Sequence, residues 1–148
     1  MINENEILEA KDLDQWMDLA ESRMPGNLYF LYEACFSGSF VAMLKNESML
    51  DSKRIIMTSA SNEDAHLLHE GALSFSYQFW ASMFESPYVY FAFNQAQTMM
   101  QTYQTPQLDA DGDGIANEKK DFLVYWAAWM YQYKKARYVR FLMHCHEY

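Results

Sequence analysis

The sequence is short of cysteine, proline and glycine for a chain of 148 residues, with two, three and five of them. Two cysteines, Cys35 and Cys145, exclude a disulfide framework and leave only a single bridge open. No apolar run approaches the ~20 residues that cross a bilayer. The acidic stretch from Met1 to Lys11 lacks the apolar centre of a signal peptide. We therefore expect neither a membrane partner nor a signal sequence in this chain, and its localisation stays open.

Positive charge is scarce as well. The chain has 11 lysine and arginine residues against 20 aspartate and glutamate residues, for a formal net charge of -9. Because an acidic surface repels phosphates, this balance argues against nucleic acid as a partner. The basic residues lie mostly near the end of the chain, among many aromatic ones. This change of composition predicts two parts: residues 1–121, and an aromatic, basic tail at 122–148 that could pack on an open sheet, bind a partner or touch an anionic membrane surface.

Apolar runs alternate with helical patterns over residues 1–121. The almost continuous runs at 27–34 and 54–60 predict strands buried on both faces, as in a parallel sheet. One helix is predicted to open at Asp12 and end at Pro25-Gly26, and others are predicted at 40–45, 73–84 and 88–103. This order predicts the α/β class with a mostly parallel sheet. Two strands are too few for a stable sheet, so we expect a missing segment or a second copy of the chain to cover its open edge.

Cys35 stands at the carboxyl end of the first predicted strand. In open α/β sheets, ligands bind beyond the carboxyl ends of the strands, so a thiol there is within reach of a substrate. The small residues Ser37 and Gly38 would let a peptide approach closely, and the backbone N–H of Cys35 could hold an oxyanion. The alternative is a cysteine that serves as a small hydrophobic core residue.

The residues around Cys35 resemble a known family. Glu33-Ala-Cys35-Phe-Ser-Gly-Ser39 is similar to the nucleophile motif of the legumain-type (C13) cysteine peptidases, which belong to the same clan as the caspases. The similarity covers residues 10–121, most clearly at 53–65, 74–80 and 104–109, and is greatest to bacterial legumain-like domains. The resemblance implies the C-terminal half of the catalytic domain. This half would be a partial caspase-hemoglobinase-like three-layer sandwich that lacks its N-terminal strands.

The resemblance also implies a cysteine endopeptidase that acts on peptide or protein substrates and needs no cofactor for catalysis. Cys35 would attack the scissile carbonyl, and a histidine after the preceding core strand would act as acid and base. The N–H groups of Cys35 and of a glycine beside that histidine would form the oxyanion hole. For Glu33 the alternative is a strand-end carboxylate in water, and for the two later serines it is an ordinary strand-end hydroxyl. The residues implied to line the substrate cleft are Glu33, Ser37, Gly38, Ser59 and Ser61.

No histidine precedes Cys35 in the sequence. A thiol without a neighbouring base is only a few per cent thiolate near neutral pH. His66 and His69 follow the second predicted strand at the same edge of the sheet, so either could be a surrogate base; solvated loop histidines are the alternative. The first hypothesis is therefore that the chain is an incomplete half of a cysteine endopeptidase, which works with a complementary N-terminal half, in cis or from another chain. The second hypothesis is an inactive fragment or pseudo-peptidase that acts as an interaction or calcium-binding module.

Residues 109–121 form an acidic segment that contains glycine. Alternate carboxylates can converge on one hard cation, and Gly114 permits the sharp turn of such a loop. An EF-hand would have a bidentate glutamate at the twelfth position, where this chain has Lys120. The pattern therefore resembles the aspartate-rich calcium loops of exported bacterial proteins and favours a structural Ca2+, with a solvated acidic loop as the alternative. The candidate ligands are Asp109, Asp111, Asp113, Asn117 and Asp121.

Overall fold

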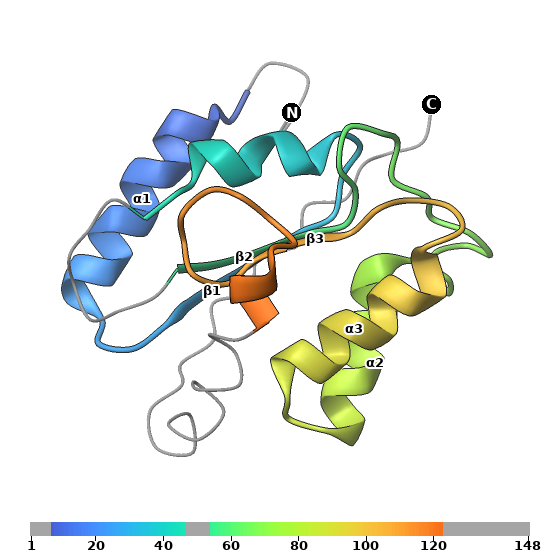
Figure 1. Ribbon diagram of the computed structural model, residues 1–148. Coiled ribbons are helices and arrows are strands. Elements are labelled where there is room, and N and C mark those ends of the chain that lie inside the picture. Colours follow the sequence, from blue (N-terminus) through green and yellow to red (C-terminus); the bar gives the residue numbers. More distant parts are fainter. Residues whose placement is uncertain (1–6, 47–53, 123–148) are drawn as a thin grey trace.

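A three-stranded sheet forms the middle layer of the protein, whose computed structural model describes residues 7–46 and 54–122. The strands lie in the order β1-β2-β3 and cross the centre of the molecule (Figure 1). β1 and β2 are parallel, with Phe30 opposite Ile56, whereas β3 runs antiparallel to β2, with Asp109 opposite Ile56. The strands are β1 (Leu28–Tyr32), β2 (Arg54–Thr58) and β3 (Gln107–Asp109).

Helices cover both faces of this sheet (Figure 1). On one face α1 and the 3-10 helix η1 pack against Phe30 and Ile56, and on the other α2 and α3 pack against Leu31 and Met57. Successive side chains of a strand thus enter two different apolar cores, which explains why β1 and β2 are apolar along most of their length. This three-layer arrangement confirms the predicted α/β class. The helices are α1 (Ala10–Arg23), η1 (Ser37–Met43), α2 (Phe75–Glu85) and α3 (Val89–Met100).

The third strand is the main difference from the predicted fold. The sequence predicted two strands and a loop from residue 109, but β3 pairs with β2 on the side that faces away from β1. β3 has only three residues, follows Pro106 directly and contains one apolar side chain, Leu108. A segment this short carries no periodic signal. Its antiparallel direction makes the sheet mixed within the described part of the chain.

Helix boundaries differ from the prediction by a few residues. α1 begins at Ala10 with Glu9 in the N-cap position, and not at Asp12. η1 begins at Ser37, three residues before the helix predicted at 40–45. α2 begins after Ser74, whose hydroxyl accepts a hydrogen bond from the Tyr77 N–H at 3.3 Å. This bond satisfies one of the free donors in the first turn of α2, so the serine acts as the N-cap.

Arg54 begins β2 and is fully buried against α1. Its guanidinium donates hydrogen bonds to the carboxylates of Asp14, Asp18 and Glu21 and to the carbonyl oxygen of Leu44. Burial by itself lowers the pKa of Arg54, but the bonds to Glu21 and Asp14 outweigh burial, and the pKa is raised above its ordinary value. A charged group therefore fixes α1 against the first residue of β2.

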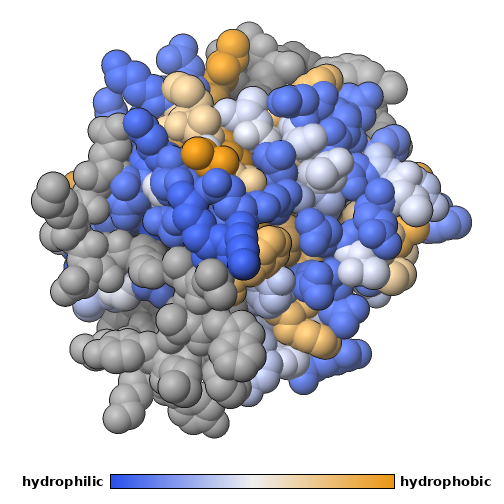
Figure 2. Space-filling view, viewed as in Figure 1, coloured by the Kyte–Doolittle hydropathy of each residue, from blue (hydrophilic) through white to orange (hydrophobic). Residues whose placement is uncertain are grey.

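The surface drawn in Figure 2 is mainly hydrophilic, with separate hydrophobic patches. Single exposed apolar side chains such as Phe84, which is 92% exposed, are ordinary on a protein surface. None of the described helices combines the length and the hydropathy of a membrane-spanning helix. The predicted tail and Cys145 lie outside the described residues, apart from Phe122, whose ring meets Tyr90 of α3 edge-on at 5.5 Å between centroids.

Candidate functional site

Cys35 lies in a tight turn between β1 and η1, at the carboxyl edge of the two parallel strands. Its thiol is free and exposed. The next residue, Phe36, has a left-handed backbone with a φ of 55°, which a bulky residue adopts only where surrounding contacts hold it. One such contact is the hydrogen bond from the Phe36 N–H to the carbonyl oxygen of Glu63, at 2.9 Å. The chain thus turns away from the sheet directly after Cys35 and leaves the thiol on the surface.

Ser37 and Ser59, both predicted to line the substrate cleft, are fully buried beside this turn. The Ser59 hydroxyl accepts a hydrogen bond from the Ala34 N–H at 3.2 Å, and the Ser37 hydroxyl accepts one from the Ala60 N–H at 3.1 Å. The two hydroxyl oxygens lie 3.5 Å apart. Together they join the end of β1 to the end of β2, so they fix the backbone on both sides of Cys35.

Gly38 lies where η1 passes close to the end of β2. A Cβ atom on Gly38 would come within 2.6 Å of Oε1 of Gln107, 2.8 Å of Cα of Ser61 and 2.9 Å of the carbonyl oxygen of Ala60. The last two are backbone atoms that cannot rotate away. Any side chain at this position would therefore push η1 off the end of β2.

Glu33 was predicted either near the substrate pocket or as a carboxylate in water. Its side chain is buried, with 6% of the residue exposed, so the second interpretation is wrong. The carboxylate accepts hydrogen bonds from the N–H groups of Phe75 and Ser76, at 2.8 and 3.2 Å, and from the Ser76 hydroxyl. These donors belong to the first turn of α2, where the helix dipole favours a negative charge.

Ser61 lies half-buried at the end of the β2 segment and donates both its N–H and its hydroxyl to the carboxylate of Glu63. The Thr105 N–H donates to the same carboxylate at 2.5 Å. Burial raises the pKa of Glu63, but the bonds from Ser61 and Thr105 outweigh it, and the pKa is lowered. Glu63 thus holds the turn at Cys35 and Phe36 through its carbonyl oxygen and two further segments through its side chain. Glu63 is not among the residues predicted from the sequence, because these contacts leave no local pattern.

The two histidines after β2 are placed differently from each other. His66 is half-buried, and its backbone N–H donates a hydrogen bond to Oε1 of Gln104 at 2.6 Å. The centroid of its imidazole ring lies 6.2 Å from that of the Tyr103 ring. His69 is exposed in a turn with a φ of 51°. Within residues 7–46 and 54–122, neither imidazole is hydrogen-bonded to the Cys35 thiol. Gln104, a second residue that the sequence analysis missed, also donates to the carbonyl oxygen of Ser59 at 2.7 Å.

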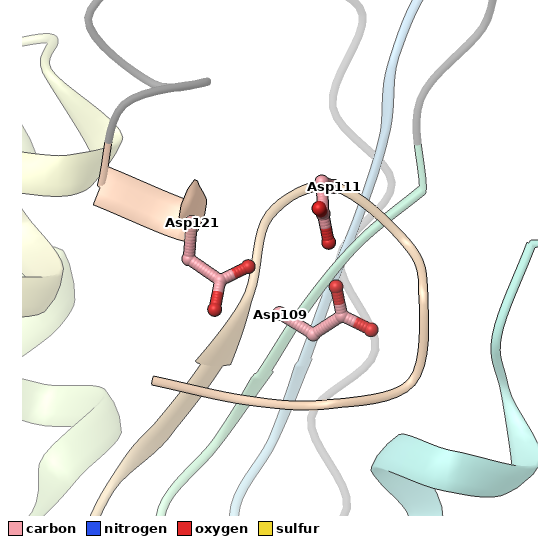
Figure 3. A group of neighbouring side chains, drawn as sticks. All are labelled: Asp109, Asp111 and Asp121. Carbon is pink, nitrogen blue, oxygen red and sulfur yellow. The ribbon is translucent and has the colours of Figure 1, made fainter. Parts of the chain in front are cut away.

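The acidic loop brings together three of its five predicted ligands (Figure 3). One carboxylate oxygen from each of Asp109, Asp111 and Asp121 lies within 4.8 Å of the others. Burial, together with the charges of Asp121 and Asp111, raises the pKa of Asp109 to about 6. The backbone N–H groups of Gly114 and Gly112 donate hydrogen bonds to its carboxylate, which lower the pKa but do not outweigh burial. The pKa of Asp121 is also raised, first by burial and then by the charge of Asp111. The three carboxylates thus form one negative cluster.

The other two predicted ligands of the loop point elsewhere. The side-chain amide of Asn117 accepts a hydrogen bond from the backbone N–H of Leu108 at 3.1 Å. The same amide donates one to the carbonyl oxygen of Pro106, also at 3.1 Å. Asp113 is paired with the ammonium group of Lys120, which also lies 3.4 Å from Oδ2 of Asp111. The loop therefore carries one positive charge of its own beside the carboxylate cluster. Because β3 is antiparallel to β2, this loop lies at the sheet edge opposite to Cys35.

Comparison with known protein families gives a match over most of the chain. The sequence model of the peptidase C13 family matches residues 1–108, a range that includes Cys35, the turn around it and most of β3. No curated protein and no solved structure matches the chain. The acidic loop beyond residue 108 lies outside the matched range.

Proposed function

Because the chain belongs to the peptidase C13 family, we propose that it carries the nucleophile of a cysteine endopeptidase and that this nucleophile is Cys35. The observation that supports this role is the exposed thiol on a left-handed turn at the carboxyl edge of the parallel strands. In such sheets this edge is where ligands bind. Family membership supports cysteine-peptidase chemistry, and the geometry favours Cys35 as the residue that performs it.

The proposed reaction has two steps. The thiolate of Cys35 attacks the scissile carbonyl carbon, the amine leaves with a proton from a general acid, and a thioester remains. Water, deprotonated by the same group acting as base, then attacks the thioester carbonyl, and the C–S bond breaks to release the carboxylic acid and the thiolate of Cys35. The backbone N–H of Cys35 donates no hydrogen bond to any described residue, so it is free to stabilise the oxyanion. We propose that the acid and base is a histidine of a complementary N-terminal half or of a second chain.

Thiol labelling tests this proposal. The purified chain is treated with a peptidyl electrophile over a range of pH, with Cys35→Ala and Cys145→Ala as matched controls and a free cysteine derivative as the reference thiol. Labelling of Cys35 about a hundredfold faster than the reference at neutral pH would support an activated nucleophile. Labelling at the reference rate would mean that this chain alone holds no activating base, which agrees both with a histidine supplied by a complementary half or a second chain and with the alternative, an inactive fragment or pseudo-peptidase that acts as an interaction module.

We also propose that the loop at 109–121 binds a structural Ca2+. The support is the convergence of Asp109, Asp111 and Asp121, in which Oδ1 of Asp111 is buried without a hydrogen-bond partner. A hard cation prefers such oxygen ligands. The ammonium group of Lys120 would have to move aside, because it lies against the same cluster.

Calorimetry with CaCl2 tests the calcium proposal, with MgCl2 as the comparison. We expect Ca2+ binding that Asp111→Asn removes and that Lys120→Met strengthens, because the methionine keeps the length of the side chain and removes its charge. A chain that gives no heat and no shift of its melting temperature up to about millimolar Ca2+ would contradict the proposal.

A further inference from the structure

We propose that Glu63 is a positioning residue, which fixes the left-handed turn that presents the Cys35 thiol. The inference rests on the proposed function of Cys35 as nucleophile. Glu63 lies in the connection from β2 to α2 and is half-buried. It holds the turn at residues 34–37 with its carbonyl oxygen and is itself held by its carboxylate. Loss of the carboxylate should therefore loosen the turn.

The left-handed residue of this turn needs support from another segment. Phe36 has a φ of 55°, which is unfavourable for a bulky side chain. Its ring is 53% exposed, so core packing does not hold it. Its carbonyl oxygen accepts the N–H and the hydroxyl of Ser39 at 3.0 and 2.7 Å, but Ser39 belongs to η1, which follows directly. The bond from the Phe36 N–H to the carbonyl oxygen of Glu63, at 2.9 Å, comes from outside the turn.

The carboxylate of Glu63 determines where that carbonyl oxygen lies. Oε1 accepts the N–H groups of Ser61 and Thr105 at 3.1 and 2.5 Å, and Oε2 accepts the Ser61 hydroxyl. The bonds from Ser61 close a tight turn after β2, and the bond from Thr105 ties it to the connection between α3 and β3. Burial raises the pKa of Glu63, but these bonds outweigh burial and lower it, so the carboxylate is charged at neutral pH.

Gln104 makes a second connection between the same two segments. It is buried, its Nε2 donates to the carbonyl oxygen of Ser59 at 2.7 Å, and its Oε1 accepts the His66 N–H at 2.6 Å. Glu63 reaches in the opposite direction, to Thr105. Partners 38 to 45 residues further along the chain thus hold the segment that supports Phe36.

The bond to Glu63 also affects which donor can stabilise an oxyanion. The Phe36 N–H is already donated to Glu63, so the N–H of Cys35 is the donor that this part of the turn offers. A looser turn would leave the directions of that N–H and of the thiol undefined. Glu63 should therefore matter for a reaction that needs both groups in fixed positions, and little for a reaction that needs the thiol alone.

Two reactions of Cys35 test the inference on the full chain with Cys145→Ala. Iodoacetamide needs only the thiol, whereas a peptidyl acyloxymethyl ketone also brings a carbonyl oxygen to the Cys35 N–H. Backbone hydrogen exchange is measured at residues 36 and 37 and in β2. The variants are Glu63→Gln and Ser61→Ala. Glu70→Gln is the matched control, because Glu70 lies in the same connection, is exposed, and its side chain bonds to no described residue.

A second set of variants also carries Phe36→Asn. Asparagine tolerates the left-handed backbone better than phenylalanine does, so the turn then depends less on support from Glu63. The effect of Glu63→Gln should shrink in this background. A general loss of stability would instead add to the effect of Phe36→Asn unchanged.

We expect Glu63→Gln to speed exchange at residues 36 and 37 about fivefold, the factor for one hydrogen bond of ordinary strength. It should slow the peptidyl reaction relative to iodoacetamide by at most that factor. Ser61→Ala should act in the same direction but less, because the bonds from the two N–H groups remain. Glu70→Gln should change nothing, and exchange in β2 should stay the same in every variant. With Phe36→Asn, the effect of Glu63→Gln should fall below about twofold.

Three results would overturn the inference: unchanged exchange at residues 36 and 37 in Glu63→Gln, an equal change in Glu70→Gln, or an undiminished effect of Glu63→Gln beside Phe36→Asn. A wild-type chain that prefers the peptidyl reagent no more than a free cysteine derivative does would count against the proposed function instead. Exchange at residues 36 and 37 then decides the positioning by itself. If the wild-type chain does prefer the peptidyl reagent, Glu63→Gln must weaken that preference, and an unchanged preference refutes the inference.

Discussion

Replacing Arg54 with methionine should destabilise the protein strongly. The guanidinium is fully buried and lies 2.5 Å from Asp14, 2.6 Å from Asp18 and 2.8 Å from Glu21. The side chain of Glu21 is only 2% exposed, so the substitution leaves a buried carboxylate without its counter-charge. Breaking a buried ion pair on one side costs about 3–5 kcal/mol.

The other two carboxylates should contribute little. The side chains of Asp14 and Asp18 are 32% and 61% exposed, so water can solvate them once the arginine is gone. Exposed pairs are worth about 0–1 kcal/mol. The expected loss for Arg54→Met is therefore about 4 kcal/mol in the free energy of unfolding, a large part of the ~5–15 kcal/mol of a typical domain.

Urea unfolding followed by circular dichroism measures this change through the midpoint and slope of the transition. Asp18→Asn is the control for an exposed partner and should cost below about 1 kcal/mol. The double variant Arg54→Met/Glu21→Met should be more stable than Arg54→Met alone, because no buried charge remains. A loss of less than about 1 kcal/mol for Arg54→Met, or a double variant less stable than that single variant, would refute the reasoning.

Three further predictions concern the turn, the acidic loop and the helix layer. Gly38→Ala should destabilise the folded protein by about 1–3 kcal/mol, because its Cβ would clash with backbone atoms, and should slow Cys35 labelling. Gly71→Ala is the control: its Cβ would meet open space, so it should cost only about 1 kcal/mol for the positive φ and leave labelling unchanged. The pKa of Asp109 is raised to about 6 in the folded chain, whereas an unfolded aspartate releases its proton above about pH 4. Protonation of Asp109 should therefore add on the order of 2 kcal/mol to the free energy of unfolding as the pH falls from 7 to 4. Asp109→Asn, measured in EDTA, should remove that gain. Phe93→Ala should cost about 3–5 kcal/mol in thermal unfolding, against less than about 0.5 kcal/mol for the exposed Phe84→Ala.

Local pattern was sufficient to predict the α/β class, two of the three described strands and the helices between them. The apolar runs mark β1 and β2 because both are buried on both faces. α2 and α3 lie within three residues of their predicted ends, since Pro87 and Pro106 interrupt the chain beside them. β3 was missed because three residues are too few to show the alternation that reveals a strand.

The candidate site was predictable only in part. The position of Cys35 followed from its motif and from the end of the strand before it. The hydrogen bonds of Glu33, Glu63 and Gln104 join segments about 40 residues apart, and no spacing in the sequence reports such pairs. The acidic pattern predicted five ligands but could not show that Asn117 faces β3 or that Asp113 pairs with Lys120.

The position of β3 has a consequence for the rate and order of folding. Thr58 pairs with Gln107, so this contact closes a loop of roughly fifty residues, which carries a large entropic cost until α2 and α3 have shortened it. The two helices are consecutive and joined by aromatic contacts such as Phe75 on Phe93, at 5.7 Å. We expect this helical hairpin to form first and β3 to join last. Stopped-flow kinetics would then show that Phe79→Ala slows folding, whereas Leu108→Ala mainly speeds unfolding; the reverse would place β3 in the folding nucleus.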